Sequence, residues 1–242
     1  MAINGPQYAR LPFRIPVVAL VAAALATAQQ ASAEARLQGP VFDVDSSLAM
    51  LSSGDPDRLN SASIRIMRAF QMDHAAYSNA DRQRLLDGME RVALGEAGTG
   101  ELARTRALRV AFSMLRVIAL DTFPTGEDAG IALRVLRIYE QSPRARGLAV
   151  SLLADFLAHY PQYQSEIEAL LFTAASTPQV PGVAPQTVID ALTRAGDPGI
   201  ALLRRLHDEN AVRDGNAAMY LRELARRGYP RQGPPGPGRG GS

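Results

Sequence analysis

The chain has 242 residues, of which 47% are hydrophobic and 21% charged, so it has enough apolar content for one folded domain of ordinary size. It contains no cysteine, which excludes disulfides, cysteine-ligated zinc and a thiol nucleophile, and all 26 basic residues are arginine, which excludes lysine chemistry. Residues 34–225 hold 20 arginines against 24 acidic residues, so this body lacks the basic excess that nucleic-acid binding needs, and we expect no nucleic-acid partner.

Residues 1–33 have the layout of a secretory signal peptide. Two arginines precede an apolar run over residues 17–26, and Ala31-Ser32-Ala33 forms a small-residue cleavage site before Glu34. The run is shorter than the ~20 apolar residues that span a bilayer, so we expect cleavage after Ala33 and no stable membrane span afterwards. An uncleaved N-terminal anchor is the alternative. No Arg-Arg pair precedes the run, which favours general (Sec-type) secretion and predicts a periplasmic or secreted protein.

The clearest internal pattern is a duplication, because residues 128–161 recur without a gap at residues 197–230, 69 positions later. Eleven of the 34 aligned positions are identical. A period of this size predicts a stacked array of helix pairs, with two units of about 35 residues in each offset. The identical pairs include Leu133 with Leu202, Leu152 with Leu221, and Tyr160 with Tyr229.

Apolar residues recur at helical spacing through most of the remaining chain. Gly54-Asp55-Pro56 and Gly196-Asp197-Pro198 each predict a helix start, because an Asp side chain caps free backbone N–H groups and Pro fits the first helical position. Ser78 with Asp81 resembles a capping box for another helix. The predicted helices cover residues 57–71, 79–94, 101–120, 128–140, 144–160, 165–175 and 185–195, and the second copy of the duplication repeats the pair at 128–160.

These patterns predict four parts. After the signal peptide, residues 34–53 form a connecting segment with a short apolar patch, residues 54–228 form a helical-repeat domain, and residues 229–242 form a disordered tail rich in Pro and Gly. The expected fold class is all-α, an α-solenoid of stacked antiparallel helix pairs. Polar residues replace three apolar ones in the last unit, as a terminal repeat without a covering neighbour requires: Arg204 for Val135, Arg205 for Leu136, and His207 for Ile138.

The helix openings Gly196-Asp197-Pro198-Gly199 and Asp128-Ala129-Gly130-Ile131, with Arg-bearing second helices such as residues 144–160, resemble HEAT-type arrays, a family that includes armadillo-like proteins. The resemblance covers residues 55–228. It implies protein binding or scaffolding as the role, but it identifies no partner and supplies no catalytic residue. A tetratricopeptide array has nearly the same period, and Tyr160-Pro161 at a helix end suits it, but its signature positions are not met in register.

The sequence shows no catalytic or metal-binding motif. The best local cluster is His207-Asp208-Glu209, but adjacent residues of a helix point in different directions and no second histidine lies four residues away. No serine-nucleophile motif and no phosphate loop is present. We therefore expect no metal, no cofactor and no enzymatic activity. An enzyme of unfamiliar chemistry on a helical-repeat scaffold is the alternative.

The second helices of stacked pairs line the concave side of an array, and we assign this role to the helices that begin near Glu101, Arg144, Pro185 and Asp214. Their polar stripes predict one partner-binding floor with charges of both signs, on which Arg109 and Arg116 hold carboxylates of an extended partner segment through forked hydrogen bonds. The alternative is that these stripes are only the solvated faces of amphipathic helices. The candidate partner-binding residues are Arg109, Arg116, Asp155, Asp190, Arg194 and Arg222.

Overall fold

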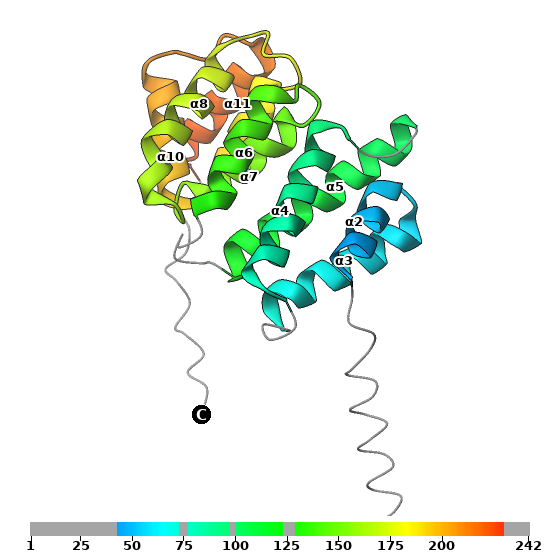
Figure 1. Ribbon diagram of the computed structural model, residues 1–242. Coiled ribbons are helices and arrows are strands. Elements are labelled where there is room, and N and C mark those ends of the chain that lie inside the picture. Colours follow the sequence, from blue (N-terminus) through cyan, green and yellow to red (C-terminus); the bar gives the residue numbers. More distant parts are fainter. Residues whose placement is uncertain (1–42, 73–76, 97–99, 123–128, 230–242) are drawn as a thin grey trace, which may run out of the picture. The chain divides into compact units, whose positions relative to one another are not determined.

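The computed structural model describes residues 43–72, 77–96, 100–122 and 129–229 (Figure 1). This part of the chain forms helices and contains no strand, so the all-α prediction is confirmed. The predicted signal peptide, residues 34–42 of the connecting segment and residues 230–242 of the predicted tail lie outside the described residues.

The helices are α2 (Val44–Ser53), α3 (Pro56–Gln71), α4 (Asn79–Leu94), α5 (Glu101–Val117), α6 (Ala129–Gln141), α7 (Arg146–Phe156), α8 (Gln164–Ser176), α9 (Pro185–Leu192), α10 (Gly196–Asp208) and α11 (Gly215–Arg226). A π-helical segment, η1 (Ile118–Thr122), continues α5, and a 3-10 turn, η2 (Pro161–Tyr163), precedes α8.

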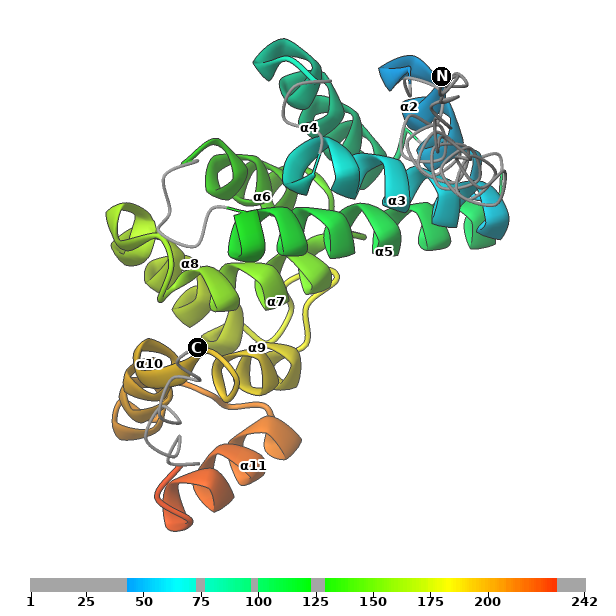
Figure 2. The ribbon, with the colours of Figure 1, turned by 90° about the horizontal axis from the view of Figure 1, so that it is seen from below.

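The helices pack in a regular order. α4 contacts α5, α6 contacts α7, α8 contacts α9 and α10 contacts α11. The odd-numbered helices α3, α5, α7, α9 and α11 also contact one another in succession, and the later members of this series follow one another in Figure 2. Among the even-numbered helices, α2 packs on α4, α4 on α6, and α8 on α10. The helices expected to carry the partner-binding floor are therefore neighbours in space.

Helix α5 supplies many of the buried residues where the N-terminal helices α2 to α5 pack together. Its residues Ala107, Ala111 and Leu115 are completely buried, and Ile118 of η1 continues this row. α5 contacts α2, α3, α4 and α7, which explains why so wide an arc of the helix is apolar. Small alanines let neighbouring helices approach closely on the buried side.

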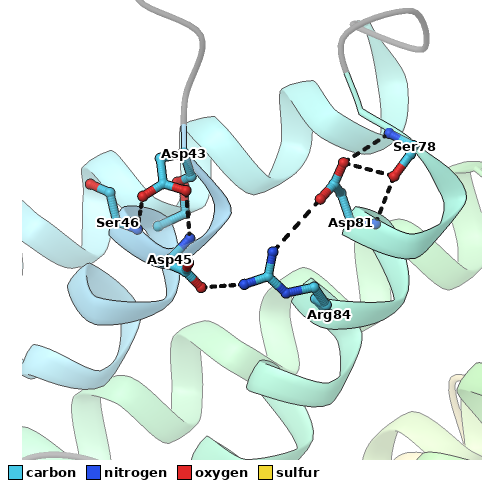
Figure 3. A network of polar contacts seen from close by, with 7 residues as sticks. Asp43, Asp45, Ser46, Ser78, Asp81 and Arg84 are labelled. Atoms are coloured by element: carbon cyan, nitrogen blue, oxygen red, sulfur yellow. Dashed lines mark hydrogen bonds and ion pairs between the residues drawn. The ribbon is translucent and has the colours of Figure 1, made fainter.

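The predicted capping box at the start of α4 is confirmed (Figure 3). The backbone N–H of Asp81 donates to Ser78 Oγ at 3.1 Å, and the backbone N–H of Ser78 donates to Asp81 Oδ2 at 3.1 Å. The hydrogen bonds that Asp81 accepts from the hydroxyl and the backbone of Ser78 hold the pKa of its carboxyl below the usual value. Arg84 lies between Asp81 and Asp45, so it links the start of α4 to the first turn of α2.

Part of the predicted connecting segment is a helix, α2, which the sequence did not reveal. Asp43 caps it by accepting from the backbone N–H groups of Asp45 and Ser46, and Leu51 is completely buried. The apolar pattern of α2 is weak because one buried position is Ser47, 2% exposed, whose hydroxyl donates to the carbonyl of Asp43 at 3.2 Å. At this buried position a serine whose hydroxyl is hydrogen-bonded to the backbone takes the place of an apolar residue.

Of the two predicted Gly-Asp-Pro helix starts, one is confirmed. Asp55 caps α3, since its Oδ1 accepts from the backbone N–H groups of Asp57 and Arg58, each at 3.0 Å. The other prediction is wrong: α10 has Ala195 as its N-cap, and Asp197 lies within its first turn. Only three residues connect α9 to α10, so the helix begins before Asp197 can act as a cap.

The duplicated residues do not all occupy equivalent environments. Leu152 and Leu221 are each 3% exposed, but Leu133 is 42% exposed and its counterpart Leu202 only 3%. Tyr229, which we assigned to the tail, is buried, and its hydroxyl donates to the carbonyl of Leu203 at 3.3 Å. The helical body therefore extends at least one residue beyond the predicted boundary.

The turn after α2 predicts a site of high sensitivity to substitution. Gly54 has a φ of +71°, and a Cβ added there would lie 2.3 Å from Cβ of Ala103 in α5. Gly54→Ala should lower the free energy of unfolding by about 3 kcal/mol, because a left-handed conformation costs ~1–2 kcal/mol and overpacking a further ~1–3 kcal/mol.

Gly228→Ala is the matched control, since Gly228 has a φ of +75° and no atom within 4 Å of the added Cβ. It should lose only the backbone part, about 1–2 kcal/mol. Urea unfolding followed by circular dichroism measures both. Equal losses in the two variants would show that the contact with Ala103 is not close.

Candidate functional site

A buried carboxylate joins α4 to α6. Glu90 on α4 has a side chain that is 9% exposed, and its two oxygens lie 2.6 Å from Arg134 Nη1 and 3.0 Å from Arg137 Nη1 of α6. Arg134 also pairs with Asp87 at 2.7 Å and donates to Gln83 Oε1 at 3.1 Å, so one guanidinium contacts three side chains of α4. This cluster fixes α6 against α4 and thereby places α7 next to α5.

A groove of about 270 Å³ lies between α5 and α7. Arg116 spans it, with Nε donating to Asp155 Oδ2 at 2.7 Å. Next to it, Arg194 Nη2 of the segment after α9 donates to Ser151 Oγ of α7 at 3.1 Å. The groove is lined by Arg109, Phe112, Ser113 and Arg116 of α5 and by Leu148, Ser151, Leu152 and Asp155 of α7.

The structure brings some of the predicted partner-binding residues together. Arg109, Arg116 and Asp155 line the same groove, and Arg194 reaches its wall through Ser151. Asp190 instead accepts from Gln186 Nε2 within α9 at 2.8 Å. Arg222 is exposed on α11 and has no hydrogen bond or ion pair with a described residue.

The two arginines that we expected to hold partner carboxylates, Arg109 and Arg116, differ in whether they already have a partner within the protein. Arg116 already pairs with a carboxylate of the protein, that of Asp155, whose side chain is only 15% exposed. Arg109 is exposed and makes no hydrogen bond or ion pair with any described residue. Arg109 is therefore the residue of the two whose guanidinium is available to a partner.

A second hollow, of about 390 Å³, lies between the end of α4, the first half of α5 and the start of α7. We refer to it as the α4–α5–α7 pocket. Sequence reasoning did not find it, because its polar residues come from separate segments that carry no motif. It is lined by Val92, Ala93, Leu94 and Gly95, by Glu101, Arg104, Thr105, Leu108 and Arg109, and by Ser142, Arg144 and Leu148.

Among the described residues, no group of three or more His, Cys, Asp or Glu side chains could hold a metal ion. His207 lies beside Asp208, with its Nδ1 3.1 Å from Oδ1, at the exposed end of α10. Of the helices that the structure describes, none has the length and apolar character needed to cross a bilayer.

Comparison of the chain with protein-family models, with curated proteins and with solved structures finds no match. The resemblance to HEAT-type arrays therefore stays a prediction.

The Glu90 cluster predicts a large loss of stability when one partner is removed. Arg134→Met should lower the free energy of unfolding by about 3 kcal/mol, because it leaves a buried carboxylate with one partner fewer. Arg144→Met is the control, since Arg144 and its partner Glu101 have side chains that are 67% and 69% exposed. Removing such an exposed pair costs about 0–1 kcal/mol. Thermal and urea unfolding measure both, and similar losses would contradict the role of Glu90.

Proposed function

We propose that this chain is an exported helical-repeat protein, an α-solenoid similar to HEAT-type arrays, that binds a protein or peptide partner. The partner would lie along the face formed by α5, α7, α9 and α11. The succession of contacts among these helices supports the proposal, because stacked helix pairs expose such a row as a continuous binding surface. The signal-peptide pattern of residues 1–33 supports export.

The observation that carries the proposal is the position of Arg109. Its guanidinium is exposed and has no partner among the described residues, and it lies where the α5–α7 groove meets the α4–α5–α7 pocket. A cation beside apolar hollows offers a partner both a charged contact and buried surface, which is the usual composition of a binding hot spot. Arg116 lines the same groove, but it already pairs with Asp155, so we assign no partner contact to it.

Site-specific photo-crosslinking in the native host tests the binding face. A photo-reactive residue in place of Ser113, which is exposed in the groove, should give a discrete adduct with another protein. The same residue in place of Leu133, 42% exposed on α6, is the matched control and should give none. Adducts of equal yield at both positions, or none at position 113, would contradict the proposed face.

Export is tested by cell fractionation with N-terminal sequencing. The protein recovered outside the cytoplasm should begin at Glu34. The Ala33→Arg variant is the control, because it removes the small residue before the cleavage site and should retain the N-terminal segment. Recovery of the parent protein intact from the cytoplasm would contradict the proposal.

A further inference from the structure

The α4–α5–α7 pocket combines apolar walls with cationic side chains. Its apolar walls come from the last turn of α4, including Val92, and from Leu108 of α5 and Leu148 of α7. The charged residues of its lining are three arginines, Arg104, Arg109 and Arg144, and one acidic residue, Glu101. A ligand that suits both parts carries a negative charge close to an apolar group.

The three arginines are not equally available. Arg144 Nη1 lies 2.9 Å from Glu101 Oε2, and Arg104 makes an interaction of its own. Arg109 makes none with the described residues, so its forked donors are free for a ligand. A guanidinium binds a carboxylate through two parallel hydrogen bonds, which gives direction as well as strength.

Ser142 is a second and independent indication of a ligand. It is only 8% exposed and lines the pocket, yet its hydroxyl has no hydrogen bond with any described residue. Its carbonyl is occupied, because it accepts from the backbone N–H groups of Ala145 and Arg146. The hydroxyl therefore has a free donor and a free acceptor at the pocket surface, which a polar atom of a bound molecule can meet beside the apolar walls.

We infer that the α4–α5–α7 pocket binds the free C-terminus of a peptide chain whose last residue is apolar. The terminal carboxylate pairs with Arg109, the last side chain contacts Leu108 and Leu148, and the Ser142 hydroxyl bonds to a peptide group. The inference rests on the proposed function in that the partner is a protein or peptide. It adds which end of the partner is recognised, and by which residues.

The size and polarity of the pocket favour this occupant. Its volume of about 390 Å³ lies at the small end of the range for ligand sites, so it suits a terminal residue and part of the preceding one. An alkyl carboxylate shares the charge and the apolar body, but beside its carboxylate it has no peptide group to bond to the Ser142 hydroxyl. A peptide has such a group next to its terminal carboxylate.

Fluorescence anisotropy with the purified protein tests the inference. The probe is a labelled peptide that ends in leucine with a free carboxylate, and the comparison is the same peptide with a C-terminal amide. The acid should bind saturably. The affinity of the amide should be lower by at least about tenfold, because the amide lacks the charge that Arg109 recognises. Equal affinity of acid and amide, or no binding of the acid, would overturn the inference.

Variants assign the contacts. Arg109→Gln should weaken binding of the acid about tenfold without changing the weak binding of the amide. Arg58→Gln, a change of an exposed arginine on α3 whose side chain has no described partner, should change neither. Ser142→Ala should weaken the acid several-fold and leave octanoate binding unchanged. Full affinity of a folded Arg109→Gln protein, checked by its thermal midpoint, would overturn the inference, as would octanoate binding more tightly than the peptide.

The peptide-binding measurement and the photo-crosslinking of the binding face can fail separately. Crosslinks at position 113 without binding of the acid peptide would overturn the pocket and leave the proposed function standing. Binding of the acid peptide without crosslinks at position 113 would overturn the proposed face and support the pocket.

Discussion

The structure depends on one buried carboxylate, that of Glu90, and on the two arginines of α6 that reach it. The pair of Glu90 with Arg134 requires a defined geometry, because both side chains are largely removed from water, at 9% and 14% exposure, and each is stabilised mainly by its partners. Arg134 meets this requirement by contacting Gln83, Asp87 and Glu90 together, which aligns α6 with α4 over two turns. Since α5 packs on α4 and α7 packs on α6, this alignment contributes to the placement of the two helices that line the α5–α7 groove.

The exclusive use of arginine suits this kind of assembly. A guanidinium has several donors in a fixed fork, so it can bond to residues of two helices without being deprotonated or reoriented. Arg116 of α5 donates to Asp155 of α7, and Arg194, which follows α9, donates to Ser151 of α7, so each joins its own segment to α7. Arg109 differs from Arg116 and Arg194 because no described residue pairs with its guanidinium. It lines both the α5–α7 groove and the α4–α5–α7 pocket.

The duplication shows how far equal sequence gives equal structure. Leu152 and Leu221 lie on matching helices, α7 and α11, and both are buried. Leu133 and Leu202 do not match, because α6 and α10 have different neighbours: α6 packs on α4 and α7, whereas α10 packs on α8, α9 and α11. The polar replacements predicted for a terminal unit agree with this, as Arg204, Arg205 and His207 are exposed where Val135, Leu136 and Ile138 are buried.

The sequence by itself determined the all-α class, the bounds of α4 and the caps Ser78 and Asp55, because periodicity and capping act over a few residues. It did not reveal α2, where Ser47 takes a buried position, or the early start of α10, which a three-residue connection imposes. Only the tertiary structure decided which arginines are already paired. Arg116 meets Asp155 across 39 residues of chain, and such a pairing depends on how helices stack, which no local pattern records.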